Sequence, residues 1–305
     1  MSHEVGNESI SRGGLVEKQP QEVDKPIAPV EEPEMGFLDH LEALRWHILR
    51  GVGSVFVFAI IAFIFGDFVF DKVLFGPRDP NFLTYKALCK VAAFLDTPSL
   101  CIQTFNYNII SIKLMTQFAV HIQISIAIGL IIGFPYFFWE VWRFVRPGLY
   151  PTEQKVSRGA TFVVSFLFLS GILFGYFVLT PISLNFLANY SVGSVATVQN
   201  QIALSDYLSV ITMLTLTCGL MFQLPVVVYF LSKIGFVTPA LMREYRRHSI
   251  VVVMIVSAVI TPPDVFSQIL IAMPISLLYE VSIKVSARVE KQRQKAALDF
   301  ERGES

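Results

Sequence analysis

The short segment RPGLYPTEQK, residues 146–155, has the composition of a stiff binding loop. Its two prolines and its glycine restrict or bend the backbone, so its one carboxylate, Glu153, is held in place. A ligand that binds such a preorganised group loses little ordering entropy. The plain alternative is a solvated loop charge that pairs with Lys155 or Arg158. The residues of the loop alone leave both interpretations open.

Catalytic chemistry is not indicated by the rest of the chain. A G-x-S-x-G nucleophile turn, an HExxH zinc motif, a Walker A loop and a G-x-G-x-x-G dinucleotide motif are all absent from the sequence. We therefore expect a protein that is not an enzyme and that has no cofactor and no bound metal.

The elements that must carry this loop are strongly apolar. Of the 305 residues, 53% are hydrophobic and 16% are charged, whereas about 25% are charged in ordinary soluble domains. Residues 159–205 and 207–232 contain no Asp, Glu, Lys or Arg, which is typical of segments that cross a bilayer. The predicted fold class is therefore all-α, a polytopic integral membrane protein. Its six predicted transmembrane helices are residues 48–66, 118–139, 159–180, 207–232, 249–263 and 265–279.

Basic residues predict the orientation of these helices. The loop 181–205 and the turn 262–264 contain no Lys or Arg, whereas the loops on the other side contain several, so the positive-inside rule places both termini in the cytoplasm. We predict a disordered cytoplasmic tail at 1–35, a six-helix membrane domain at 36–284 and a cytoplasmic C-terminal tail at 285–305.

The last two predicted helices are short. Each has fifteen uncharged residues, or about 22 Å of helix against a hydrocarbon thickness of about 30 Å. Either flanking basic side chains extend to the headgroups or the bilayer thins around them. In the turn between them Asp264 is well placed to cap the second helix, which favours a structural role.

Two cysteines, Cys89 and Cys101, fall in the predicted external loop. In an oxidising compartment they could form a disulfide that closes a loop of about a dozen residues and contributes about 3 kcal/mol. Sequence spacing cannot fix the geometry, so a bridge and two free thiols remain equal alternatives.

Four stretches together resemble the motifs of a known family. In chain order they are MGFLDHLEALRWHILR (35–50), WRFVRPGLYPTE (142–153), FQLP (222–225) and TPPDVFSQ (261–268). They resemble the TatC family, the core membrane component of the twin-arginine protein translocase, over about residues 35–285. The resemblance implies a receptor for folded cargo proteins whose signal peptides carry two adjacent arginines.

The resemblance implies that Glu153 binds the signal peptide, because the family has a signal-binding glutamate at this place in its first cytoplasmic loop. Carboxylates accept guanidinium groups bidentately, a geometry that lysine cannot copy. The rigid loop, including Pro147, would hold the carboxylate in place. Phe144, Leu149 and Tyr150 could line an apolar shelf beside it, although aromatic side chains at a membrane interface are more often simple anchors.

Arg143 and Arg146 lie close to this carboxylate in the sequence. They would repel an arginine-bearing peptide unless they face elsewhere or pair with Glu140.

The first stretch departs from the family pattern. In HLEALR the usual glutamate position holds Ala43, and the carboxylate stands one residue earlier at Glu42. On a helix this turns the charge by about 100°. Arg45 matches the family's arginine. Glu42 is therefore a weaker candidate for the second contact, its alternative being an ordinary charge in the first turn of a helix.

Polar residues inside the apolar segments are candidates for contact with a partner's helix. Gln223 occupies a position where the family commonly has a polar or acidic residue, and Gln268 and Asp264 lie in the last stretch. Each could hydrogen-bond a partner's transmembrane helix, but packing within this chain is an equal or better alternative.

The resulting prediction is a receptor and core subunit of the twin-arginine translocase in the bacterial inner membrane. Its expected partners are twin-arginine signal peptides, TatA-like and TatB-like single-span proteins, the lipid bilayer and further copies of itself, with no nucleic acid. The resemblance implies that the proton gradient drives export. The sequence itself has no energy-coupling motif. The alternatives are a small-solute transporter or channel and a structural scaffold in the membrane.

Overall fold

The computed structural model describes residues 37–94, 96, 108–145, 157–190, 201–261 and 265–301. The chain divides into two units, residues 1–40 and 41–305. Of the first unit, the described part is the first turn of helix α1 (Phe37–Ile64). The second unit, called the helical body below, contains all the other elements.

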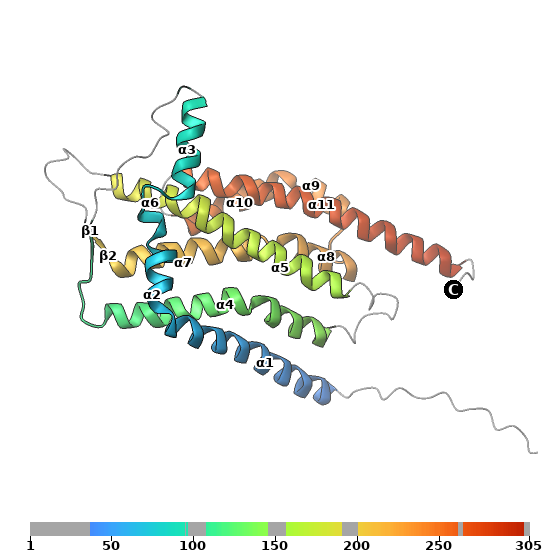
Figure 1. The fold of residues 1–305 in the computed structure, drawn as a ribbon. Coiled ribbons are helices and arrows are strands. Elements are labelled where there is room, and N and C mark those ends of the chain that lie inside the picture. Colours follow the sequence, from blue (N-terminus) through green and yellow to red (C-terminus); the bar gives the residue numbers. More distant parts are fainter. Residues whose placement is uncertain are drawn as a thin grey trace, which may run out of the picture. The chain divides into compact units, whose positions relative to one another are not determined.

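The helical body is built from long helices joined by short elements (Figure 1). Between α1 and the next long helix lie α2 (Gly66–Phe68), the π-helical turn η1 (Val69–Leu74), the 3-10 turn η2 (Gly76–Arg78), α3 (Leu83–Phe94) and strand β1 (Asn108–Ile110). Then follow α4 (Thr116–Val145), α5 (Ser157–Phe174), the π-helical turn η6 (Gly175–Leu179), α6 (Thr180–Asn189) and strand β2 (Gln201–Ala203). The last elements are α7 (Leu204–Met221), α8 (Leu224–Ile234), α9 (Pro239–Glu244), α10 (Arg246–Ile260) and α11 (Val265–Glu301).

Five stretches of the described residues are long and apolar enough to cross a membrane. They are Leu44–Ile64, Thr116–Phe144, Thr161–Asn189, Leu204–Ile234 and Ser267–Lys295. Each coincides with a predicted transmembrane helix. The remaining prediction, residues 249–263, corresponds to α10, which has 15 residues.

The predicted short final helix is wrong. α11 has 37 residues and continues to Glu301, well past the predicted end at 279. The apolar run ends there, but Glu280, Lys284 and most of the charged or Ala and Gln residues that follow are good helix formers, so the helix continues after hydrophobicity stops. The helix also passes through the predicted domain boundary at 284, which itself stays a prediction.

One predicted helix contains a π-helical segment. α5, η6 and α6 follow one another without a break, and Pro181 lies in the first turn of α6. A proline lacks an N–H and so leaves the carbonyl four residues earlier, that of Phe177, without its helical donor. The Thr84 hydroxyl from α3 donates to this carbonyl, and the Thr180 hydroxyl donates to the Gly175 carbonyl at 2.9 Å. The proline site thus connects α3 to η6.

The fourth predicted helix is broken instead. α7 ends at Met221 and α8 begins at Leu224, with Pro225 in its first turn. The Gln223 side chain donates from Nε2 to the Val164 carbonyl of α5 at 3.2 Å, so the break is fastened to a neighbouring helix.

A small sheet that the sequence analysis did not predict joins two connecting segments. β1 and β2 pair in parallel over three residues each, Asn108 opposite Gln201. We call the end of the helical body that carries this sheet the strand end. The opposite end, where α1 begins and α4 and α8 end, is called the base (Figure 1).

The interior is apolar and tightly packed around α7. α5 and α7 approach closely through glycine: a Cβ on Gly171 would lie 2.6 Å from the Cys218 carbonyl oxygen, so no larger residue fits without movement. Buried clusters join α4 to α5 through Phe134 and Phe168, and α7 to α10 and α11 through Leu214 and Ile271.

Candidate binding site at the base of the helical body

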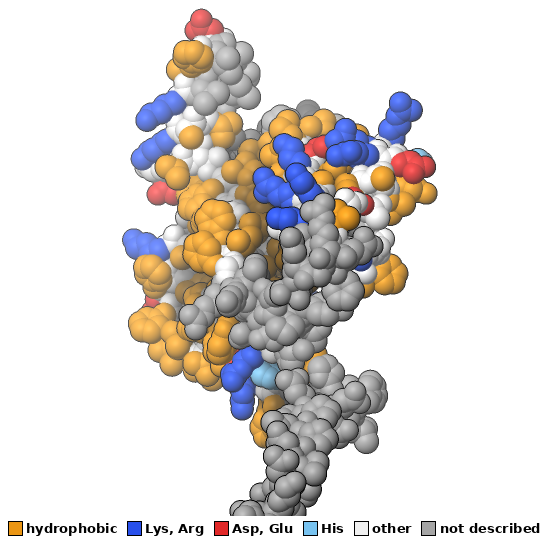
Figure 2. Space-filling model, turned by 90° about the vertical axis from the view of Figure 1, so that its right-hand side faces the viewer, with side chains coloured by type: hydrophobic (Ala, Val, Ile, Leu, Met, Phe, Trp, Pro, Cys, Tyr) orange, Lys and Arg blue, Asp and Glu red, His pale blue; other side chains and the backbone are white. Residues whose placement is uncertain are grey.

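The base presents basic and apolar side chains together. Figure 2 looks onto this end and shows Lys and Arg side chains around it, with hydrophobic side chains on its flanks. This is the arrangement expected where helices leave a bilayer, since cationic groups favour the headgroup region. The predicted site residues that the structure describes at this end are on α1 and α4.

The first turns of α1 carry two exposed charges. The side chains of Glu42 and Arg45 are both exposed, and neither has an ion-pair partner among the described residues. They are three residues apart and so lie on neighbouring positions of one helical face.

A buried carboxylate fastens α1 to α4. Glu140 is 1% exposed, and its Oε2 lies 2.6 Å from Nδ1 of His47 on α1. The Tyr136 hydroxyl donates to Oε1 of the same carboxylate at 3.1 Å. An ionised carboxylate is costly to bury unless it is paired and hydrogen-bonded, and here both of its oxygens have a partner. This cluster fixes where the charged start of α1 stands relative to the end of α4.

The pairing of Arg143 with Glu140, one of the two arrangements considered from the sequence, is not the one found. The guanidinium of Arg143 lies over the Trp139 ring, 5.6 Å from its centroid, and Glu140 takes His47 instead. The Arg143 side chain is exposed.

Phe144 is the part of the predicted apolar shelf that the structure describes. Its ring centroid lies 6.3 Å from that of His47, so this side chain also borders the α1–α4 cluster. Pro147, Leu149, Tyr150 and Glu153 lie outside the described residues, and their role stays a prediction.

The predicted partner-helix residues make contacts within the chain. Gln223 donates to the Val164 carbonyl, as described above, and Gln268 donates from Nε2 to the Met254 carbonyl of α10 at 3.1 Å. These hydrogen bonds support the packing alternative for both amides. Asp264 lies outside the described residues.

Cys89 forms a disulfide, but its predicted partner lies outside the described residues, so the Cys89–Cys101 pairing stays a prediction. Cys89 lies in α3, whereas Cys101 lies outside the described residues. Cys218 is a free, buried cysteine in α7.

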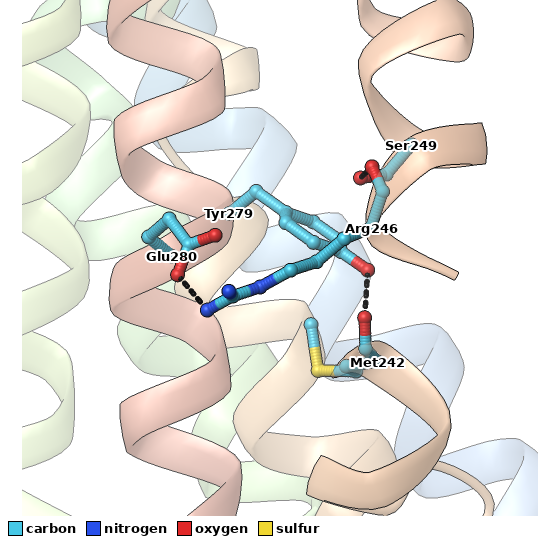
Figure 3. Close-up of polar contacts among 5 residues, drawn as sticks. All are labelled: Met242, Arg246, Ser249, Tyr279 and Glu280. Atoms are coloured by element: carbon cyan, nitrogen blue, oxygen red, sulfur yellow. Dashed lines mark hydrogen bonds and ion pairs between the residues drawn. The ribbon is translucent and has the colours of Figure 1, made fainter. Parts of the chain in front are cut away.

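A second charged pair at the base is exposed. The Arg246 guanidinium at the start of α10 donates to Glu280 of α11 at 2.6 Å, with both side chains about half exposed (Figure 3). Next to it the Tyr279 hydroxyl donates to the Met242 carbonyl of α9 at 2.8 Å. The ion pair links α10 to α11, and the Tyr279 hydrogen bond links α11 to α9. Neither charged side chain of the ion pair is buried.

The sequence analysis missed His47 and Tyr136 and left Glu140 outside the second predicted helix, which it ended at residue 139. Glu140 is in fact within α4, which continues to Val145. An ionisable residue inside a membrane helix that carries a suitable partner on a neighbouring helix is a recognisable signal. The wrong helix boundary hid that signal.

No cluster of His, Cys, Asp or Glu that could hold a metal ion is found within the described ranges.

The chain matches a family model, that of the Sec-independent protein translocase protein (TatC), over residues 39–274. This chain belongs to the TatC family. The family consists of translocase components, in agreement with the prediction that the chain is not an enzyme.

Curated relatives extend the match over nearly the whole chain. The chain is 35% identical over 265 residues to a Sec-independent protein translocase protein TatC of Blattabacterium sp. subsp. Periplaneta americana, which covers 86% of this chain and 99% of that protein. It is 34% identical to a TatC protein of Helicobacter pylori strain J99 over 82% of this chain and 88% of the relative.

Solved structures of the family have the same fold. A crystal structure of the twin-arginine translocase receptor TatC superposes with a TM-score of 0.60 at 27% identity, covering 82% of this chain and 99% of that one. A second crystal structure of that receptor, in DDM, gives a TM-score of 0.63 at 29% identity over 81% of this chain and 99% of the other. The predicted family is thus confirmed. The protein is an all-helical, multi-pass membrane protein with five to six membrane-length helices.

Proposed function

We propose that this protein is the receptor and core subunit of a twin-arginine translocase, and that its base binds the Arg-Arg signal peptides of folded export substrates. The observation that carries the proposal is the exposed Glu42 on α1, which has no ion pair with any described residue, in a chain of the TatC family. It stands at the end of the helical body where α4 leads into the segment that contains Glu153.

Two carboxylates would then divide the arginine pair between them. Glu153 accepts one guanidinium group and Glu42 the other, each through bidentate hydrogen bonds. Arg45, three residues after Glu42, lies on a neighbouring position of the same helical face. Phe144 and the loop residues Pro147, Leu149 and Tyr150 would cover the apolar parts of the peptide.

The buried contacts of Glu140 with His47 and Tyr136, called the clasp below, give the site its rigidity. The clasp holds α1 against α4, so that the distance between Glu42 and the end of α4 changes little when a peptide binds. Preorganisation of this kind lowers the entropy lost on binding.

The proposal includes the wider setting of the family. The protein would lie in the bacterial inner membrane with six transmembrane helices, both termini in the cytoplasm and α10 as the short fifth helix. TatA-like and TatB-like single-span proteins and further copies of this chain would join it, and the proton gradient would drive transport. Gln223, Gln268 and Asp264 would be the points at which a partner helix meets the body. The Cys89–Cys101 bridge, if formed, would brace the external segment.

Signal-peptide crosslinking tests the recognition site. A peptide with a photoreactive group beside its Arg-Arg pair should label the wild-type protein in membranes. We expect Glu153→Ala to reduce labelling at least tenfold and Glu42→Ala to reduce it less, because Glu42 is turned away from the family's usual position. A Lys-Lys peptide should label the wild type weakly.

Glu280→Ala provides a matched control, since Glu280 is another half-exposed carboxylate at the base but is paired to Arg246. It should leave labelling unchanged. If the Glu153 and Glu42 variants, alone and combined, bind the Arg-Arg peptide as well as the wild type does, the base is not the recognition site.

Reduction tests the disulfide. After labelling with a thiol reagent that adds mass, the oxidised wild type should carry no label at these two cysteines on a non-reducing gel, the Cys101→Ser variant one, and the reduced wild type two. Equal labelling of Cys89 before and after reduction would rule the bridge out.

A further inference from the structure

An apolar groove at the strand end belongs to no part of the proposed recognition site. It has a volume of about 690 Å³ and is enclosed by α1, η1, α4, α5, η6 and α7. Most of its lining is Ile, Leu, Val and Phe, such as Ile124, Ile128 and Ile211. The groove opens to the surroundings of the helices, because the lining side chains of Phe65, Phe68, Ile132 and Leu173 are each more than half exposed.

The depth of the groove matches one leaflet of a bilayer. Along α4 its lining runs from Ile124 to Ile132, which is about 12 Å at 1.5 Å per residue. Half of a hydrocarbon core is about 15 Å. The groove therefore begins near the strand end and stops near the midplane.

A single cation stands at its outer part. Among the described residues that line the groove, Lys72 alone carries a charge, and it has no ion pair with another described residue. Lys72 lies in η1, which follows α1 and α2 at the strand end. The η1 turn is held in place because the Tyr176 hydroxyl donates to the Val73 carbonyl, so the backbone that carries Lys72 is fixed beside the groove.

We propose that the groove binds one acyl chain of a phospholipid from the leaflet at the strand end, with the lipid phosphate paired to Lys72. An apolar channel of one-leaflet depth with a cation at its outer part matches the shape and charge of such a lipid. The phosphate satisfies the unpaired ammonium group, and the acyl chain fills apolar space that would otherwise be empty.

A transmembrane helix is a poorer match for the same groove. A helix of about 10 Å diameter and about 30 Å length occupies on the order of 2,400 Å³, more than three times the volume of the groove, 690 Å³. Helix–helix contacts in membranes also favour small residues, whereas bulky side chains dominate this lining.

The hydroxyl of Thr215 provides a test that distinguishes a lipid acyl chain from a polypeptide helix in the groove. It is a buried polar atom without a hydrogen-bond partner in the described structure, and it lines the groove. An acyl chain cannot hydrogen-bond it, so Thr215→Val should leave lipid binding unchanged or strengthen it. A polypeptide that uses this hydroxyl would instead be weakened.

The experiment uses the full-length protein, delipidated in detergent and titrated with palmitoyl-oleoyl-phosphatidylglycerol while native mass spectrometry records bound lipid. We expect one tightly held lipid per chain. Dioleoylglycerol, which lacks the phosphate, and inorganic phosphate, which lacks the chains, should each bind at least tenfold more weakly. Lys72→Gln should weaken the phospholipid about tenfold, as expected for the loss of one charge-assisted contact.

Matched variants distinguish the groove from the general lipid-facing surface. Ile128→Trp fills the groove and should abolish tight binding, whereas Ile126→Trp, on the half-exposed outer face of the same helix, should not. Lys113→Gln removes another exposed cation that does not line the groove and serves as the charge control. Equal lipid retention by the Ile128 and Ile126 variants, or by the Lys72 and Lys113 variants, would overturn the proposal. So would weaker binding by Thr215→Val.

Discussion

The contact of α1 with α4 and the contact of α5 with α7 solve the same packing problem in different ways. Both bring helix backbones together over glycine: a Cβ on Gly129 would lie 2.6 Å from the Val55 carbonyl oxygen, and one on Gly171 would lie equally close to that of Cys218. Yet 17% of the apolar window of Leu44–Ile64 is buried, against 33% in the other four spanning stretches. α1 is held at one edge, whereas α5 and α7 form the interior.

Polar groups make up the difference for α1. His47 pairs with Glu140 at the base, and at the strand end Nε2 of His121 lies 3.1 Å from the Phe63 carbonyl oxygen while its ring stacks on Phe63. The edge helix thus relies on two polar contacts and a glycine crossing, and the interior helices rely on continuous apolar packing. We expect damage to the interior to unfold the protein and damage to the edge to release α1 alone.

The largest effect should come from crowding the interior. Gly171→Leu would push a side chain against the α7 backbone, which cannot yield as a flexible side chain can, so we expect a loss of about 3 kcal/mol or more and aggregated protein in detergent. Size-exclusion chromatography and thermal unfolding measure this. Gly159→Leu in the same helix has no described neighbour within 4 Å and should behave as wild type. Equal behaviour of the two variants would contradict the interior role of α5.

The next effect should come from the buried clasp. His47→Ala leaves the Glu140 carboxylate buried without its imidazole partner and should cost about 3 kcal/mol, and the double-mutant cycle with Glu140→Ala should show a coupling of about 2 kcal/mol. Thermal unfolding measures both quantities.

The exposed pair in Figure 3 is the control for this cycle. Arg246 and Glu280 are the same distance apart as the buried pair, 2.6 Å, but lie in solvent or headgroups, so their coupling should be below about 1 kcal/mol. Equal couplings for the two pairs would mean that burial does not set the strength of the clasp.

A smaller effect is expected at the other end of α1. His121→Ala removes the contact with the Phe63 carbonyl and the ring stack, and should destabilise the α1 terminus by about 1 kcal/mol. Hydrogen exchange of the α1 amides near residue 63 should rise, while that of α7 should not. Gln123→Ala, an exposed neighbour on the same helix, should leave the α1 amides unaffected. Unchanged exchange in His121→Ala would show that the glycine crossing alone holds α1.

The smallest effect is expected at the α7–α8 break. Gln223→Leu removes one hydrogen bond to the Val164 carbonyl, and such bonds inside membrane proteins contribute about 0.6 kcal/mol on average. The melting temperature should therefore fall only slightly. If Gln223 also meets a partner helix, crosslinking of a TatA-like protein near this position should fall while stability is kept. A large fall in melting temperature would identify the amide as an essential part of the interior.

The transmembrane helices could be predicted from the sequence because the bilayer requires long uncharged runs, and such runs are visible without any tertiary information. Helix ends were harder. The loss of hydrophobicity at residue 279 ended the last predicted helix, although Lys and Glu continue a helix readily, and the predicted end at 139 excluded Glu140 from α4.

Pairings between distant segments could not be predicted. Nothing in the local sequence of Asn108–Ile110 or Gln201–Ala203 indicates a partner about ninety residues away. Glu140 would have stood out as an ionisable residue within a helix had the helix end been placed correctly, but the sequence does not show that its partner is His47, 93 residues away. The proposal that Glu42 and Glu153 are recognition residues came from a resemblance. Of the two, the structure describes Glu42, whose side chain is exposed.

The strand pair has a mechanical consequence. β2 is followed directly by α7, and five residues separate β1 from α4. The hydrogen bonds between the two strands therefore couple the starts of these two helices. A force that tilts α4 is therefore transmitted to α7 at the strand end, and the two helices tilt together. A change in the spacing of α4 and α7 would therefore be smallest at this end.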